Sequence, residues 1–374
     1  MRVAALVLGI ILTLWTFWAM VLAMLVPHGR TNGIARSVQG FVWTIARAPL
    51  RALRTYRLQD RWLAGVAPLS IILQLVVYAI ILILTLGLMV YGLTDLTLGD
   101  SLYQSGSTFT TLGIVEPVNV PSTLTTFLAA FLGLVVIAIF IGYLMSTYSA
   151  YVSRESQMAR VALLAGEPAW GPQILIRGGL IGLPTDELPD AASWTDWVTS
   201  VRMNQVVNGA LGDFRSPSPW RHWTTTLLAV LDAAALQLAC APRGTQPHLV
   251  ELVTQAAASL RVMSSTDRGS GRVPNWTIES EMLDVLADRF DETGDPHLTR
   301  MEFDDAVEEL TKAGFLVPVD VDGTWRRFSA IRAKYAPDAI ALAIRHHAVR
   351  SPWSGPRVPA TPVVWPVRAS RGTP

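Results

Sequence analysis

The residues from Asp100 to Pro117, which read DSLYQSGSTFTTLGIVEP, form a polar segment between two long uncharged stretches. The segment contains Gly106, Gly113 and several hydroxyl side chains, and it has no Lys or Arg. Irregular backbone at membrane depth is permitted only where protein or a water-filled cavity satisfies its polar groups. This composition fits that requirement, and a simple loop outside the membrane would not need the threonine-rich core SGSTFTT. We therefore predict a segment that re-enters the membrane, with a short amphipathic helix from Leu98 to Phe109.

Outside this segment, no set of side chains is spaced for catalysis. The sequence shows no paired carboxylates, Ser-His-Asp set, metal cluster or phosphate-cradling glycine loop. The single cysteine, Cys240, excludes an internal disulfide framework and a cysteine-based zinc site. The adjacent His346 and His347 are interpreted as surface residues. We predict that the protein is not an enzyme and carries no cofactor.

A calcium loop is one interpretation of residues 291–302, DETGDPHLTRME. Oxygen-bearing side chains stand at five EF-hand ligand positions: Asp291, Thr293, Asp295, Thr299 and Glu302. The sixth position of such a loop turns with positive φ, which Pro296 forbids. The pattern therefore favours a solvated acidic turn over a calcium site.

The elements that would position the polar segment are membrane helices. The chain is 51% hydrophobic and 16% charged, whereas soluble domains have about a quarter charged residues. Three stretches lack charge, between Arg2 and Arg30, from Trp62 to Thr94 and from Pro117 to Ser153. Each exceeds the roughly 20 residues that a helix needs to cross a membrane. We predict membrane helices at 3–26, 67–93 and 122–150.

The loop charges predict one topology. The connector 27–65 has seven arginines and one acid, whereas the connector 95–116 has three acids and no Lys or Arg. Because positive loops stay in the cytoplasm, 27–65 and the chain after Arg154 are placed inside, and 95–121 and the N-terminus outside, in the plasma membrane. A cleaved signal peptide is the rival interpretation of residues 1–26. The apolar run is long for one and no A-x-A site follows, so an uncleaved anchor is favoured.

Apolar residues recur at helical spacing among the arginines of the connector 27–65. A helix on the inner leaflet and a solvated linker both fit this pattern. In either case we expect contact with anionic lipids.

The order helix, polar segment, helix within residues 66–151 resembles the two-helix pore module of the potassium-channel superfamily, in the style of its bacterial and two-pore-domain members. Asp100 to Tyr103 match the start of the family's pore helix, Ser107 to Thr111 its end, and Leu112-Gly113 the entry to its selectivity filter. Pro117, or alternatively Pro121, matches the proline after the filter. The resemblance covers less than a quarter of the chain.

The resemblance implies a selectivity filter whose backbone carbonyls replace the water shell of potassium or another monovalent cation. Its residues would be Thr110, Thr111, Leu112, Gly113, Ile114 and Val115, with Glu116 as a negative charge at the outer mouth. Thr111 would offer its hydroxyl and carbonyl at the inner site. Since four such segments surround the ion, the resemblance implies a homotetramer unless a partner supplies the other segments.

The chain departs from the family where an aromatic residue, a glycine and an aspartate are usual, and has Ile114, Val115 and Glu116 instead. The β-branched Val115 disfavours positive φ, and Ile114 cannot make the hydrogen bond of the aromatic residue. We therefore predict weakened potassium selectivity.

Two glycines lie in the third membrane helix. Gly142 is a candidate gating hinge, with close helix packing as the alternative, and packing is favoured for Gly133.

A mainly helical cytoplasmic domain is predicted for residues 152–350, after a continuation of the third helix through 154–165. Helices are expected at 191–209, 220–240, 246–264, 277–291, 302–314 and 337–348, and a turn-rich linker at 175–189. Asp232 and the short length of 220–240 argue against a fourth membrane span. The proline-rich tail 351–374 is expected to be disordered.

The C-terminal end of the predicted cytoplasmic domain resembles a winged-helix unit. Helix 302–314 is followed there by a predicted β-hairpin, whose strands FLVPV and TWRRF are joined by an Asp322-Gly323 turn. The helix is acidic, which opposes nucleic-acid binding and favours either a protein partner or a packing role. In sum, the sequence predicts an all-α membrane protein: a potassium-like cation channel subunit with a possible gating domain. The alternative is a non-conducting membrane sensor or scaffold that keeps the pore fold and acts through its cytoplasmic domain.

Overall fold

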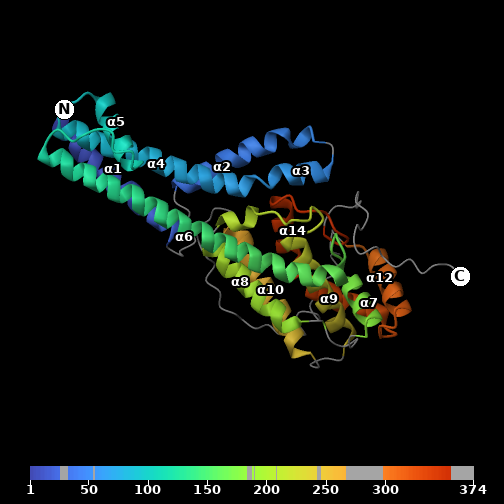
Figure 1. Ribbon diagram of the computed structural model, residues 1–374. Helices are drawn as coiled ribbons and strands as arrows, with labels where there is room; N and C mark the ends of the chain where they lie inside the picture. Colours follow the sequence, from blue (N-terminus) through green and yellow to red (C-terminus); the bar gives the residue numbers. More distant parts are fainter. Residues whose placement is uncertain are drawn as a thin grey trace. The chain divides into compact units, whose positions relative to one another are not determined.

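The computed structural model describes residues 1–25, 33–53, 55–182, 188, 190–207, 209–241, 246–266 and 298–354. All regular secondary structure in these ranges is helical (Figure 1). The N-terminal elements are α1 (Arg2–Met24), α2 (Gly33–Arg47), η1 (Ala48–Arg51), α3 (Tyr56–Leu63), α4 (Val66–Leu93), α5 (Leu98–Phe109) and α6 (Val120–Ala165). The later elements are α7 (Gly171–Leu180), α8 (Ala191–Val207), η2 (Gly209–Asp213), α9 (Trp223–Cys240), α10 (Pro247–Thr266), α12 (Arg300–Lys312), α13 (Val321–Arg332) and α14 (Ala336–Arg345).

The chain forms two compact units, which are described separately. The first unit comprises Met1–Arg54, Trp62–Ser149 and Val207–Phe214. The second unit comprises Thr55–Arg61, Ala150–Val206 and Arg215–Pro374.

Within the described ranges, four helical stretches are long and apolar enough to cross a membrane: Arg2–Met24, Tyr56–Leu93, Val120–Ala165 and Trp223–Cys240. In the first three, 28–33% of the most apolar window is buried within the protein, which leaves most of that surface for lipid or other chains. In Trp223–Cys240 the buried share is 89%. The protein itself therefore covers most of the surface of α9.

In the first unit, α1 packs closely against α4 through small residues. A Cβ placed on Gly92 would lie 2.8 Å from the Arg2 carbonyl oxygen, and one on Gly9 would lie 2.8 Å from the Thr85 carbonyl oxygen. The Thr13 hydroxyl donates to the Thr85 hydroxyl at 2.9 Å. Small residues and hydroxyl pairs are typical of contacts between membrane helices. Helix α1 is thus an integral part of this unit.

In the second unit, α9 lies at the centre and contacts α7, α10, α13 and α14. Its one acid, Asp232, is 1% exposed. The Arg332 guanidinium (Nε) and the Tyr335 hydroxyl donate to Asp232 Oδ1 at 2.9 and 2.7 Å. A buried carboxylate needs such partners, so this apolar helix carries its acid for contacts within the protein.

The predicted winged-helix hairpin is wrong, because residues 321–332 form helix α13. The Asp320 carboxylate accepts from the Gly323 N–H at 2.8 Å, which is the geometry of a helix N-cap. An aspartate followed by glycine suits a tight turn as well as a helix start, and the local sequence does not separate the two.

The predicted linker at 175–189 is also wrong in its first part, because α7 continues to Leu180. Pro172 lies in its first turn, where proline is tolerated, and Gly178 is buried. The other predicted cytoplasmic helices are present within a few residues, and α6 continues to Ala165 as predicted. The predicted helix 277–291 and the tail from residue 355 lie outside the described residues. Trp353 is buried and packs edge-on against Trp170 at 6.0 Å.

Candidate functional site

The helix that begins the polar segment has the bounds that the sequence predicts, Leu98 to Phe109. Thr97 caps it, because the threonine hydroxyl accepts from the Asp100 N–H at 3.2 Å. The buried side of α5 is polar and comprises Ser101, Gln104, Ser105, Ser107 and Thr108, followed by Phe109. Such a helix must find hydrogen-bond partners within the protein.

These partners lie on α4 and α6. The Ser105 hydroxyl donates to the Ile83 carbonyl of α4 at 2.9 Å, and the Gln104 amide donates to the Thr126 hydroxyl of α6 at 3.3 Å. At the C-terminal end of α5, the Phe109 carbonyl faces Gly133, where a Cβ would lie only 2.1 Å from that oxygen. Gly133 is therefore a close-packing position, as predicted.

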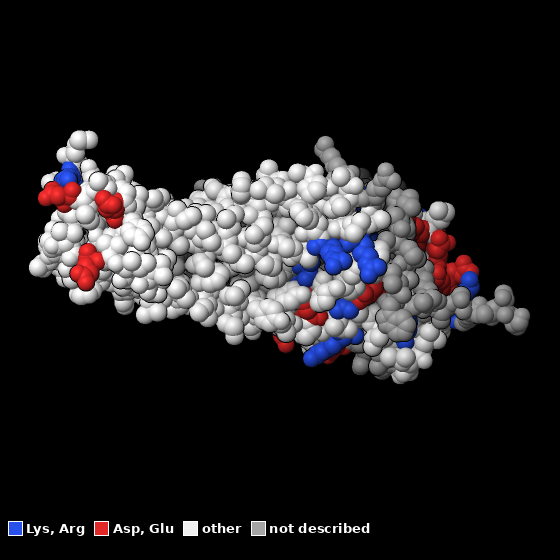
Figure 2. All heavy atoms as spheres, turned by 45° about the horizontal axis from the view of Figure 1, so that its top comes forward, with Lys and Arg blue, Asp and Glu red and all other residues white. Residues whose placement is uncertain are grey.

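These contacts define the path of the polar segment. Gly133 lies 13 residues into α6, about 20 Å along its axis. After α5 the chain returns to the end of α4, where the Asn119 amide donates to the Leu93 carbonyl at 2.9 Å. Residues 98–119 thus enter and leave at the same end of α4 and α6. The exposed acids of this segment and its lead-in are Asp95, Asp100 and Glu116, and Asp95 pairs with Arg2 at 2.9 Å. Figure 2 shows acidic side chains and a basic one beside a broad surface without charged residues, with further acidic side chains elsewhere on this face.

After α5, four consecutive N–H groups point back toward the helix. The Thr111 N–H donates to the Thr108 carbonyl at 2.9 Å. The Leu112 and Gly113 N–H groups donate to the Ser107 carbonyl at 2.8 and 3.2 Å, and the Ile114 N–H donates to the Ser107 hydroxyl at 2.9 Å. Within the described residues, the backbone carbonyls from Thr110 to Glu116 accept no hydrogen bond. The N–H groups as far as Ile114 are therefore bonded to α5, whereas the carbonyls from Thr110 to Glu116 have no donor in the described residues, which suits contact with water or a cation.

Two residues of the segment have left-handed backbone, Thr111 with φ 63° and Gly113 with φ 64°. This conformation is costly for a β-branched threonine and easy for glycine. Such strain persists only where the surroundings impose it, and it is concentrated at functional sites. Val115 does not have positive φ, so the chain avoids there the conformation that its side chain disfavours.

The side chains of the segment are uncovered in a single chain. Leu112 and Ile114 are 67% and 63% exposed, and no atom lies within 4 Å of a Cβ placed on Gly113. Thr110, Thr111 and Glu116 are also exposed, and Val115 is half-buried. Most of the sequence-predicted filter residues are thus exposed in the single chain.

Gly142 lies on the exposed part of α6, and no atom lies within 4 Å of a Cβ placed there. Close packing within one chain therefore does not account for this glycine. Among the exposed large apolar residues of α6, eight recur every three or four positions along the helix: Leu124, Phe127, Phe131, Leu134, Ile137, Ile141, Met145 and Tyr148. This spacing places them on one face.

The candidate calcium residues do not form a site in the part of the chain that the structure describes. Asp291, Thr293 and Asp295 lie outside the described residues. The Glu302 carboxylate accepts from the N–H and the hydroxyl of Thr299, both at 2.9 Å, in the capping box that begins α12. The described residues hold no group of three or more His, Cys, Asp or Glu that could bind a metal.

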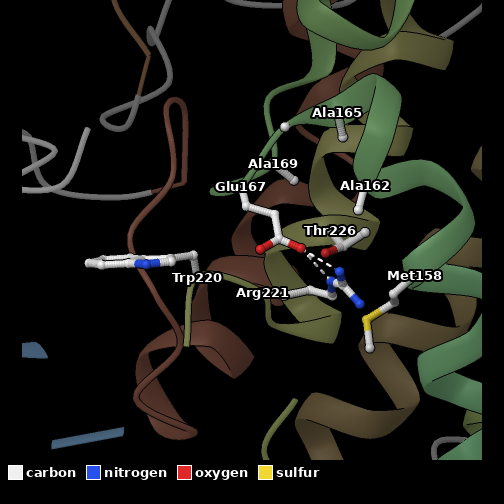
Figure 3. A pocket seen from close by; sticks show the side chains of 9 residues that line it. Met158, Ala162, Ala165, Glu167, Ala169, Trp220, Arg221 and Thr226 are labelled. Atoms are coloured by element: carbon white, nitrogen blue, oxygen red, sulfur yellow. Dashed lines mark hydrogen bonds and ion pairs between the residues drawn. The ribbon is translucent and has the colours of Figure 1, made fainter. Parts of the chain in front are cut away.

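The second unit has a small hollow of about 180 Å³ beside α6, shown in Figure 3. Apolar side chains such as Met158 and Ala162 line it, and Glu167 and Arg221 form an ion pair across it (Figure 3). This volume includes open solvent, and the hollow has no room for a water-sized molecule, so we assign no ligand to it.

A buried polar cluster around Arg215 is a feature that sequence reasoning missed. Arg215 pairs with Asp60 of α3 at 3.2 Å and donates to the His347 carbonyl at 2.8 Å. The Tyr151 hydroxyl of α6 donates to the Arg215 carbonyl at 3.1 Å. The cluster thus connects α3, which precedes α4 along the chain, to the continuation of α6. No local signal identifies it, because its members are far apart in the sequence.

Comparisons of the chain with protein-family models, with curated proteins and with solved structures find no match.

Proposed function

We propose that the chain is the pore-forming subunit of a cation channel, which moves potassium-like monovalent cations passively through a homotetrameric pore. The observation that carries this proposal is the segment from Thr110 to Glu116, whose N–H groups from Thr110 to Ile114 bond back to α5 and whose carbonyls accept no hydrogen bond within the described residues. Carbonyl oxygens with no other partner can replace the water shell of a cation.

The path of residues 98–119 supports a re-entrant pore loop. The loop enters and leaves at one end of α4 and α6, and its helix is satisfied by contacts with both. Irregular backbone in a membrane requires such satisfaction or a water-filled cavity. The proposed topology places this end outside the plasma membrane and the connector 27–65 and the second unit in the cytoplasm.

We propose that selectivity for potassium is weak. Ile114 is 63% exposed and braces no neighbour in the single chain, and Val115 lacks the left-handed conformation that a glycine would permit. The left-handed residues Thr111 and Gly113 would keep the inner ion sites, while the outer sites lose their usual geometry.

The alternative is a non-conducting sensor or scaffold that acts through a protein partner of the second unit. The Arg215 cluster favours keeping this alternative, since it joins Asp60 of α3, the continuation of α6 and the His347 carbonyl within the second unit without requiring a pore. The two functions differ in one observable, ion flux from the purified protein.

The test is cation flux in liposomes that contain only this protein. We expect flux of both potassium and sodium, and loss of flux in Gly113→Leu, because a side chain there meets positive φ and crowds the pore. The double variant Ile114→Tyr/Val115→Gly is expected to raise the permeability ratio of potassium to sodium. Absence of flux from folded wild-type protein would favour the scaffold, and strict potassium selectivity of the wild type would contradict the weak-filter proposal.

The same liposomes test the proposed lipid partner. α3 exposes Arg57, Leu58, Arg61 and Trp62 together, while its acid, Asp60, is paired with Arg215. This arrangement suits an anionic membrane surface. We expect more flux with anionic than with neutral lipids, and equal flux at equal protein incorporation would exclude the lipid contribution.

A further inference from the structure

Ser107 holds most of the backbone that follows α5. Its carbonyl accepts the N–H groups of Leu112 and Gly113, and its hydroxyl accepts the N–H of Ile114 at 2.9 Å. One residue near the end of α5 therefore receives three consecutive donors. The Ser107 residue is only 5% exposed, so water does not compete freely for these bonds.

The hydroxyl contact differs in kind from the carbonyl contacts. Any residue at position 107 would supply the backbone carbonyl, so the bonds to Leu112 and Gly113 do not depend on the side chain. The bond to Ile114 requires an acceptor on a short side chain. Neighbouring hydroxyls serve other purposes, since Ser105 donates to Ile83 of α4 and Thr110 donates to the Gly106 carbonyl.

The hydroxyl contact also lies at the position where few other contacts hold the backbone of the segment. Gly113, which precedes Ile114, has φ 64°, and the exposed Ile114 side chain makes no hydrogen bond that could hold the backbone in place. Because the Ile114 N–H points at Ser107 and the peptide is trans, the Gly113 carbonyl of the same peptide points away from Ser107. The hydroxyl thus fixes the orientation of the peptide between Gly113 and Ile114.

We propose that Ser107 is a positioning residue that sets the carbonyl orientation of the filter segment at Gly113 and so its ion selectivity. This inference rests on the proposed channel function for its effect on ions, whereas the positioning itself is independent of conduction. Loss of the hydroxyl would release the Ile114 N–H and let the peptide rotate.

The test compares Ser107→Ala with Ser107→Thr, which keeps an acceptor, and with the control Ser105→Ala. Ser105 is a suitable control because it is a serine of the same helix, is 2% exposed and bonds to α4 rather than to the segment. Amide hydrogen exchange at residues 112–114 is measured in nanodiscs, and potassium and sodium permeabilities are measured in liposomes.

We expect Ser107→Ala to speed exchange at Ile114 about tenfold, the effect of losing one hydrogen bond, while Leu112 stays protected. We expect the permeability ratio to change in Ser107→Ala, to return toward wild type in Ser107→Thr and to be unchanged in Ser105→Ala. Unaltered exchange at Ile114 in Ser107→Ala would overturn the positioning role. Faster exchange with an unchanged permeability ratio would overturn the selectivity role. If the wild type conducts no ions, the channel proposal fails, and the exchange measurement alone decides the positioning role.

Discussion

At the scale of single residues, two glycines of α6 illustrate why the same residue type serves different purposes. Gly133 is buried, and a Cβ there would overlap the Phe109 carbonyl at 2.1 Å. Gly142 is exposed, and a Cβ there would meet nothing within 4 Å of the same chain. The first glycine lets α5 approach α6, whereas the second leaves α6 free to bend or to contact another chain.

We expect Gly133→Ala to destabilise the protein and Gly142→Ala not to do so. The Cβ at 133 meets backbone rather than a flexible side chain, so α5 must move, and overpacking of this kind costs about 1–3 kcal/mol or more. At 142, alanine is the better helix former by about 0.5–1 kcal/mol. Thermal unfolding of both variants in the same detergent measures the difference. Equal melting temperatures for the two variants would contradict the close-packing role of Gly133.

At the scale of elements, helix α9 begins with an unusual N-cap residue, a histidine. His222 caps the helix, because its Nδ1 accepts from the Thr224 N–H at 3.3 Å and lies 2.8 Å from the Thr224 hydroxyl. The His222 residue is 1% exposed. Burial, with further contributions from the charges of Arg215, His346 and Arg154, holds the pKa of His222 well below its usual value of 6.5. The neutral ring is the form that can accept at Nδ1.

This cap predicts a loss of stability in acid. The unfolded chain takes up a proton at His222 near pH 6.5, whereas the folded protein does not until a much lower pH. The contribution of this residue is therefore complete above about pH 6.5 and falls by up to about 1.4 kcal/mol per pH unit below it. We expect the melting temperature to fall between pH 7 and pH 5, and to fall less in His222→Asn, which can cap but not titrate. A parallel fall in both proteins would assign the acid sensitivity to other groups.

At the scale of the whole molecule, one chain is an incomplete structure for the proposed function. It leaves Leu112 and Ile114 and one apolar face of α6 uncovered, and one segment supplies only part of an ion's coordination shell. Surfaces of this kind are expected to contact lipid, other chains or a central cavity. In a closed ring of identical chains, one repeated contact would cover these surfaces or place them around a central cavity.

We expect the purified protein in nanodiscs to contain four chains. Four copies of a 40.8 kDa chain give about 163 kDa of protein, which mass measurement separates from one, two or three copies. Phe131→Ala, on the exposed face of α6, is expected to lower the tetramer fraction, whereas Leu8→Ala, an exposed position of α1, serves as the matched control. A monomer at concentrations where flux is observed would contradict the homotetramer.

The sequence by itself determined the helical framework around the polar segment. The lengths of the uncharged stretches predict α1, α4 and the apolar part of α6, and the amphipathic pattern gives the bounds of α5, because solvation and capping are local properties. Only the tertiary structure decided which atoms meet. It directs the N–H groups after α5 to Ser107, brings Phe109 to Gly133 and surrounds the apolar α9 with protein. It also assigns Asp320 to a helix cap, where the sequence suited a hairpin equally well. The contacts of Gly133 and α9 depend on partners distant in the sequence, which local preferences do not encode. At Asp320 the partner is only three residues away, but the local sequence suits two structures, and the surrounding fold decides between them.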